Sequence, residues 1–245
     1  MSDELIRLEN ISVIYGRITA LRNLNLSIYK GDYVGIIGPN GSGKSTLLKT
    51  ILGLTKTSEG EIFYNGDIQG RNSIRMGYVP QTSDINRFFP ITVLEVVLTG
   101  RLKSEIVPMF RYSEDDKQEA LAMLDLVGLI KQKDRQISDL SGGEFQKMLI
   151  ARSLIMKPDI LLLDEPTTMV DALSQKQILT LIKRLSKDIT ILIVTHQVQT
   201  ITKQVKKLLY LEKNVLAEGD PEEVYKYAYL KPVNHKINES NYGGN

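Results

Sequence analysis

The chain has 245 residues, a formal net charge of +2, 42% hydrophobic residues and no cysteine. This composition is that of an ordinary folded protein, and the near-balanced charge argues against a nucleic-acid or anionic-membrane partner. The lack of cysteine excludes disulfides and thiolate metal sites.

The beginning of the chain shows no targeting pattern. Met1-Ser2-Asp3-Glu4 is acidic, whereas a signal peptide starts with basic residues followed by an apolar run. The longest apolar runs, at residues 160–163 and 191–194, are too short to cross a bilayer and predict buried strands. We therefore expect a cytoplasmic protein that reaches the membrane only through a partner.

The first third of the chain predicts a series of short strands. Its apolar residues place them at residues 5–11, 24–28, 33–37, 60–64 and 76–79. Lys30-Gly31-Asp32 predicts a hairpin between the second and third of these strands. Asn65-Gly66 predicts a tight turn at the end of the fourth.

A glycine-rich loop follows the strand at residues 33–37 and leads into an apolar helix. Its spacing matches G-x-x-x-x-G-K-[ST], the P-loop that binds nucleotide phosphates through backbone N–H groups and a helix N-terminus. Lys44 supplies a charge for the outer phosphates, and the Ser45 hydroxyl is expected to hold Mg²⁺. The predicted phosphate-binding residues are Gly38, Pro39, Asn40, Gly41, Ser42, Gly43, Lys44, Ser45 and Thr46.

Between residues 92 and 155 the apolar periodicity becomes helical. Thr92 and Glu95 fit a capping box, and Ser113 with the acids after it opens a second helix that stops at Gly128. A third helix begins with residues 141–144. This block predicts a helical subdomain inserted into an α/β core.

The α/β pattern then resumes. The predicted elements are strands at residues 160–163 and 190–194, a helix at 172–186, a hairpin of 207–212 with 215–219, and a short helix from Pro221. Strands that alternate with helices predict a mostly parallel sheet covered on both faces. The polar residues 234–245 are expected to be disordered.

Two adjacent acids, Asp164 and Glu165, end the apolar strand at residues 160–163. If this strand lies beside the strand that leads into the P-loop, Asp164 falls near Ser45, where Mg²⁺ would neutralise its buried carboxylate. Glu165 then falls at the γ-phosphate, placed to polarise an attacking water. The alternative is a strand that runs into an acidic turn.

Residues 141–144 form a helix start with a hydroxyl and two glycines, which is typical of an anion site. The alternative is a plain capping box before an amphipathic helix. Because the chain already has one phosphate loop, a second anion site needs either a second nucleotide or a second chain.

The order of these motifs resembles the signature of ATP-binding cassette (ABC) ATPases. Leu140-Ser141-Gly142-Gly143-Glu144 stands between a P-loop and Leu163-Asp164-Glu165-Pro166-Thr167, and the resemblance runs from about residue 5 to 227. It implies an α/β, P-loop NTPase (RecA-like) core with a mostly parallel sheet, an N-terminal antiparallel β subdomain and an inserted helical subdomain. It also implies a head-to-tail dimer with each ATP between the P-loop of one subunit and Ser141, Gly142, Gly143 and Glu144 of the other.

The resemblance extends to four single residues. Gln81 matches the glutamine that reaches Mg²⁺ and the attacking water, and His196 matches the switch histidine at the γ-phosphate. Tyr15 matches the aromatic residue that stacks on adenine. Asp171 matches the D-loop aspartate that communicates across the dimer, although Met169 is bulkier than the residue usual at its position.

The resemblance also implies a domain organisation. We expect a single ABC ATPase domain at residues 1–228, with its core at 1–82 and 156–228 and its helical subdomain at 83–155. Residues 229–245 are expected to be a flexible tail.

A single cassette with a short helical insert favours the ATPase subunit of a transporter, pairing with an integral membrane permease and an extracytoplasmic substrate-binding protein. Residues 78–85 and 89–101 are similar to zinc- and manganese-type importer ATPases. An apolar groove is expected around Phe88, Phe89, Ile91 and residues 107–110, where the permease would dock. The alternatives are an iron-chelate or cobalamin importer and a soluble ABC ATPase that remodels a protein assembly.

Overall fold

The computed structural model describes residues 3–68, 70–81, 86–102 and 111–229. The predictions made for residues 82–85, 107–110 and 230–245 lie outside these ranges. Within them, no helix is long and apolar enough to span a membrane.

A three-stranded antiparallel sheet opens the fold. It is formed by β1 (Glu4–Tyr15), β2 (Ile18–Tyr29) and β4 (Glu59–Tyr64), in the order β2-β1-β4. The tight turn predicted after β4 is present: Tyr64 and Asp67 exchange backbone hydrogen bonds of 2.8 and 3.0 Å, with positive φ at Asn65 and Gly66. This small sheet is the predicted antiparallel β subdomain.

The predicted hairpin at Lys30-Gly31-Asp32 is wrong. A turn does form there, but β2 lies in the small sheet while β3 (Tyr33–Ile37) lies in the large one. All five residues of β3 are buried. A strand buried on both faces needs neighbours and cover on both sides, which a one-sided antiparallel sheet does not supply.

The large sheet has six strands in the order β5-β6-β7-β3-β8-β9. Besides β3 it contains β5 (Met76–Val79), β6 (Ile160–Asp164), β7 (Thr190–Val194), β8 (Lys207–Glu212) and β9 (Asn214–Gly219). Neighbouring strands from β5 to β8 are parallel, and β9 returns antiparallel to β8. The predicted mostly parallel sheet is therefore confirmed.

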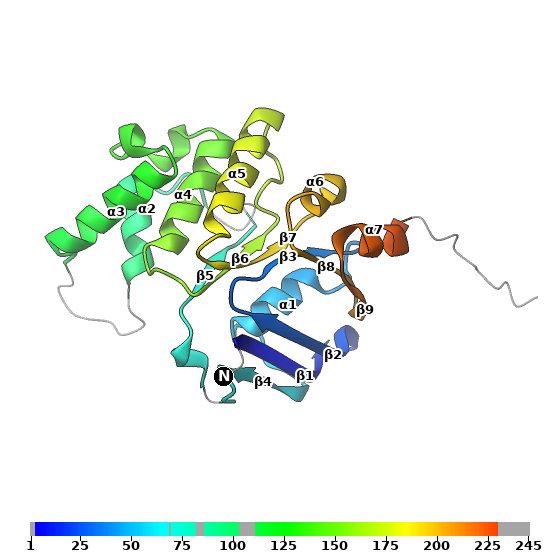
Figure 1. Ribbon diagram of the computed structural model, residues 1–245. Helices are drawn as coiled ribbons and strands as arrows, with labels where there is room; N and C mark the ends of the chain where they lie inside the picture. The colour runs from blue at the N-terminus through cyan, green and yellow to red at the C-terminus, as the bar shows by residue number, and fades with distance from the viewer. Residues whose placement is uncertain (1–2, 69, 82–85, 103–110, 230–245) are drawn as a thin grey trace, which may run out of the picture.

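Helices cover both faces of the large sheet (Figure 1). On one face, α1 (Lys44–Ile51) lies between the two sheets. On the other, α2 (Val93–Leu98), α3 (Glu114–Leu126), α4 (Gly142–Leu154) and α5 (Ala172–Leu185) gather together. The remaining helices are α6 (Val198–Thr202), which the sequence pattern did not predict, and α7 (Pro221–Tyr229), with short 3-10 turns at Gly70–Ser73, Thr99–Arg101, Ile130–Gln132 and Ile137–Asp139.

The strand residues of the large sheet alternate between two apolar cores. In β6, Leu161 and Leu163 join the core shared with α2 to α5, whereas Ile160 and Leu162 join the core shared with α1 and the small sheet. Full burial of such a side chain contributes about 1.5–3 kcal/mol to the stability of the folded state. This two-sided burial explains why the strands are continuous apolar runs.

The capping boxes predicted at Thr92 and Ser113 are present, and so is the one given as the alternative interpretation of residues 141–144. The hydroxyls of Thr92, Ser113 and Ser141 accept hydrogen bonds from the backbone N–H groups of Glu95, Asp116 and Glu144, and those acids accept in return from the capping residues. Each box satisfies otherwise unpaired N–H groups at its helix start.

Candidate active site

The P-loop and four of the predicted site residues meet where four neighbouring parallel strands end. The P-loop follows β3, Gln81 follows β5, Asp164 and Glu165 follow β6, and His196 follows β7. Because these strands are adjacent and parallel, their carboxyl ends lie at one edge of the sheet. Ligands of open α/β sheets bind at this edge.

The P-loop is held in shape by its own backbone. Gly43, the residue before α1, has φ +98°, and a Cβ there would stand 2.5 Å from the carbonyl oxygen of Ala20. Lys44 Nζ donates hydrogen bonds to the carbonyl oxygens of Gly38 (3.0 Å) and Pro39 (2.9 Å). Burial lowers the pKa of Lys44, and the nearby charges of Glu165 and Asp164 oppose that shift.

Ser45 and Asp164 are in direct contact. Ser45 Oγ donates a hydrogen bond to Asp164 Oδ1 at 3.1 Å. The strand order differs from the predicted one, because β7 lies between β6 and β3. The two residues meet nonetheless, since Ser45 is carried by α1, which packs against β6. Burial raises the pKa of Asp164, and the Ser45 hydrogen bond opposes that shift.

The carboxylate of Glu165 is the centre of the site. His196 Nε2 lies 2.7 Å from Oε1, while Gln81 Nε2 donates to Oε2 at 3.3 Å. Thr168 Oγ1 also donates to Oε2, at 3.0 Å. The sequence analysis missed Thr168, because nothing in the spacing of residues 164–168 shows that the chain turns back on Glu165.

Glu165, Gln81 and His196 line a cavity of about 820 Å³. Tyr15 lies on its wall, with its hydroxyl 3.1 Å from Thr55 Oγ1. The sequence analysis also missed Lys213, which lines the same cavity and whose backbone N–H donates to the carbonyl oxygen of Ser42 at 2.8 Å. The only available signal was the turn at Lys213-Asn214, which predicted a hairpin alone. The cavity is lined by Tyr15, Ile18, Thr19, Ala20, residues 40–46, Gln81, Glu165, His196 and Lys213.

Residues 141–144 and Asp171 lie elsewhere. None of them is among the described residues that line this cavity. Ser141 Oγ accepts from the Glu144 N–H at 3.2 Å, and the Ser141 N–H holds the pKa of Glu144 below its usual range. Asp171 caps α5, and its hydrogen bonds from Ser174 lower its pKa in the same way.

The starts of α4 and α5 are closely packed. A Cβ at Gly143 would stand 2.5 Å from the Cβ and Oγ of Ser174. One at Gly142 would stand 3.2 Å from the carbonyl oxygen of Met169. The predicted anion site and the loop before Asp171 therefore form one surface, separate from the P-loop cavity of the same chain.

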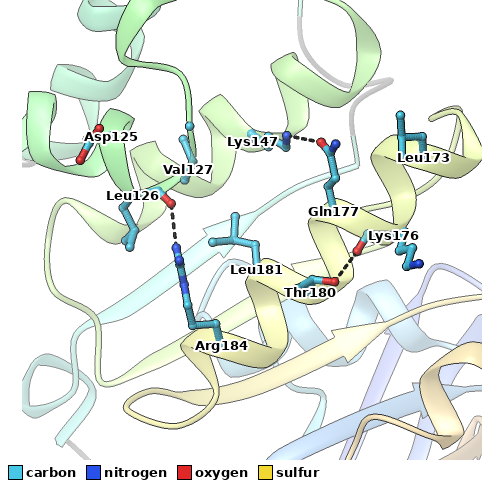
Figure 2. A pocket seen from close by; sticks show the side chains of 11 residues that line it. Asp125, Leu126, Val127, Lys147, Leu173, Lys176, Gln177, Thr180, Leu181 and Arg184 are labelled. Carbon is cyan, nitrogen blue, oxygen red and sulfur yellow. Dashed lines mark hydrogen bonds between the residues drawn. The ribbon is translucent and has the colours of Figure 1, made fainter.

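A second cavity, of about 560 Å³, lies between the end of α3, α4 and α5. Figure 2 shows Lys147 reaching Gln177 across it, with a hydrogen bond of 2.6 Å. Arg184 donates to the carbonyl oxygen of Leu126 at 2.8 Å on the other side. None of the predicted site residues lines it. These two hydrogen bonds connect α4 and the end of α3 to α5.

An apolar groove lies between α2, α4 and the residues just before α2. It has a volume of about 300 Å³ and is lined by Asn86, Phe89, Ile91, Val96, Thr99, Ile137, Met148, Leu149 and Arg152. Phe88 and Phe89 are 87% and 59% exposed, which is unusual for phenylalanine. Of the residues predicted to line this groove, Phe89 and Ile91 do so, Phe88 is exposed but is not among the lining residues, and residues 107–110 lie outside the described ranges.

Comparison with known proteins agrees with this geometry. The sequence profile of the ABC transporter family matches residues 21–168. The chain is 39% identical to the manganese transport system ATP-binding protein MntB of Bacillus subtilis, covering 90% of this chain and 88% of that protein. It is 36% identical to the zinc uptake system ATP-binding protein ZurA of Listeria monocytogenes, covering 91% and 89%. A similar solved structure is the dimeric ATP-binding cassette MJ0796 bound to ADP and Pi, with a TM-score of 0.74, 30% identity and coverage of 89% and 99%.

Proposed function

Because this chain belongs to the ABC transporter family, we propose that it hydrolyses ATP to drive uptake of zinc or manganese through a separate membrane permease. The observation that carries the proposal is that Ser45 and Glu165 line the P-loop cavity while Ser45 also donates a hydrogen bond to the buried Asp164. Binding of nucleotide follows from the family itself, whose dimeric cassette MJ0796 holds ADP and Pi.

The residues have separate roles in the proposed reaction. The P-loop and Lys44 hold the phosphates, and Tyr15 stacks on the adenine. A water oxygen attacks the γ-phosphorus, the bond to the β,γ-bridging oxygen breaks, and ADP and inorganic phosphate leave. Glu165 accepts the proton of the water, while His196 and Gln81 orient the Glu165 carboxylate and the reacting groups.

The site also fits Mg²⁺. Magnesium is usually held by one or two carboxylates together with substrate phosphates and waters, and it neutralises charge that develops on the phosphates. Asp164 is a buried carboxylate bonded to the Ser45 hydroxyl, which is the donor set that such an ion requires. Gln81, which follows β5 and donates to Glu165 through its amide nitrogen, would supply its amide oxygen as a further ligand.

A second copy of the chain would complete the nucleotide site. Residues 141–144 and Asp171 lie on a surface apart from the P-loop cavity, so we assign them to the cavity of a partner in a head-to-tail dimer. The dimeric form of the similar cassette MJ0796 supports this arrangement. Each ATP would then lie between the P-loop of one copy and Ser141 of the other.

We also propose a domain organisation for the chain and a position at the membrane. We assign residues 1–228 to one ABC ATPase domain, with core parts 1–82 and 156–228, a helical subdomain at 83–155 and a tail at 229–245. The groove at Phe89 would receive a segment of the permease, holding the chain on the cytoplasmic face of the membrane. A substrate-binding protein outside the membrane would deliver the metal to the permease.

Reconstitution tests the proposed function. The genes beside that of this chain are searched for one that encodes a multispanning membrane protein. The two proteins are co-expressed, and the purified complex is placed in proteoliposomes with ATP. We expect ATP hydrolysis and uptake of zinc or manganese, both lost in Glu165→Gln. Phe89→Asp should weaken co-purification, whereas Leu54→Asp, an exposed leucine outside the groove, should not. Recovery of a soluble partner in place of the permease would contradict the transporter assignment.

A further inference from the structure

The Glu165 carboxylate has three side-chain partners, and they come from three segments of the chain. Gln81 follows β5 and His196 follows β7, so both approach from neighbouring strands. Thr168 lies in the same loop as Glu165 and is half-buried. Its hydroxyl donates to Oε2 at 3.0 Å, a shorter contact than the 3.3 Å bond from Gln81.

We propose that Thr168 is a positioning residue for Glu165, an inference that rests on the hydrolysis proposed above. An ionised carboxylate offers about four lone-pair positions to donors. Three are taken by Thr168, Gln81 and His196, which leaves one for the attacking water. The Thr168 hydroxyl thereby sets the rotation of the carboxylate and aims its free position at the cavity that Glu165 lines.

The backbone at this loop supports the role. The Thr168 N–H donates to the carbonyl oxygen of Glu165 at 3.2 Å. The backbone and the side chain of Thr168 therefore both donate hydrogen bonds to Glu165. Glu165 has φ +50°, a left-handed conformation that needs support when the residue is not glycine. A β-branched side chain has few χ1 rotamers, so threonine holds its hydroxyl in place better than serine would.

Thr168 also joins Glu165 to the loop that faces a second copy. Met169, the next residue, has φ +60° and is 86% exposed. Its carbonyl oxygen lies against Gly142 at the start of α4, and Asp171 follows two residues later. A displacement of this loop when two copies close would therefore reach the Glu165 carboxylate through Thr168.

Steady-state ATPase measurements on the full chain test the proposal. Thr168→Val keeps the shape of the side chain and removes the donor, and we expect kcat to fall about tenfold, as for the loss of a charge-assisted hydrogen bond. The KM for ATP and the thermal midpoint should stay close to those of the parent. Thr168→Ser should recover most of kcat. Thr180→Val is the matched control, because Thr180 also loses one hydrogen bond, to Lys176 on the exposed side of α5.

A second readout measures the ATP-bound dimer directly. With Mg²⁺ and ATP, slower hydrolysis should make Thr168→Val accumulate an ATP-bound dimer in size-exclusion chromatography, while Thr168→Ser should resemble the parent. Thr168→Ala is measured alongside and should match the valine variant. A parent-like kcat in both Thr168→Val and Thr168→Ala would overturn the positioning role. A parent chain that does not hydrolyse ATP would instead overturn the proposed function.

Discussion

Ser45 donates a hydrogen bond of 3.1 Å to Asp164, a residue 119 positions further along the chain, across the width of an intervening strand. The contact is made from α1, which starts at the P-loop and packs against β6. The two groups proposed to hold Mg²⁺ therefore depend on how α1 sits on the sheet as well as on the strands themselves.

Glu165→Gln should block hydrolysis and leave ATP binding intact. Glutamine keeps the size of glutamate but cannot accept the proton of the attacking water, and loss of a general base lowers turnover by roughly 100-fold or more. We expect an ATP-bound dimer in size-exclusion chromatography. The control is Glu61→Gln, an exposed residue on β4. Hydrolysis by Glu165→Gln at the parent rate would show that another group is the base.

Lys44→Ala should weaken ATP binding. In the described chain Lys44 Nζ is held by two carbonyl oxygens of the P-loop, which points the charge at the phosphate cradle. Loss of a hydrogen bond to a charged group costs about 1.5–3 kcal/mol, so Kd measured by titration calorimetry should rise by roughly tenfold or more. Lys187→Ala, an exposed lysine after α5, should bind ATP like the parent.

Gly143→Ala should destabilise the fold. The new Cβ would stand 2.5 Å from Ser174 on α5, so the two helix starts would have to separate. Overpacking lowers the free energy of unfolding by about 1–3 kcal/mol. The better helix propensity of alanine offsets up to about 1 kcal/mol of that loss. Denaturant unfolding of Gly143→Ala, Ser174→Gly and the double variant measures this contact. If the loss of stability in the double variant equals the sum of the losses in the two single variants, the two helix starts are not in close contact at this point.

Asp116 should make stability depend on pH in the acid range. The side-chain hydrogen bond from Arg101, followed by those from Ser113, holds the pKa of Asp116 at about 2, below the usual value of about 3.9. A carboxylate with a lowered folded-state pKa contributes stability above its unfolded pKa and loses it as the pH falls. The parent should therefore exceed Asp116→Asn in thermal midpoint at neutral pH, and the gap should close between about pH 4 and pH 2.

The control for this pH dependence is Asp115→Asn. Asp115 shares the first turn of α3 with Asp116, so its removal changes the interaction with the helix dipole to a similar extent. It should not reproduce the closing gap. A parent and Asp116→Asn that lose stability in parallel over this range would show that the Arg101 pair does not stabilise the folded state.

Much of the site was predictable because its chemistry is local in the sequence. The P-loop, the capping boxes and the Asn65-Gly66 turn depend on contacts between residues three to six positions apart, so the sequence pattern contains all the partners. The pairing of Asp164 with Ser45 was also predicted, although from a wrong strand order. The two residues meet because α1, which carries Ser45, packs against β6.

What the sequence by itself determined is therefore which segments are strands, helices and phosphate loops, and which residues carry reactive groups. Only the tertiary structure decided that β7 lies between β6 and β3, that β2 and β3 belong to different sheets, and that Thr168 and Lys213 join the site. The physical reason is that all buried parallel strands share the same apolar pattern. Because this pattern does not specify which strand lies beside which, the strand order depends on the packing of the whole chain.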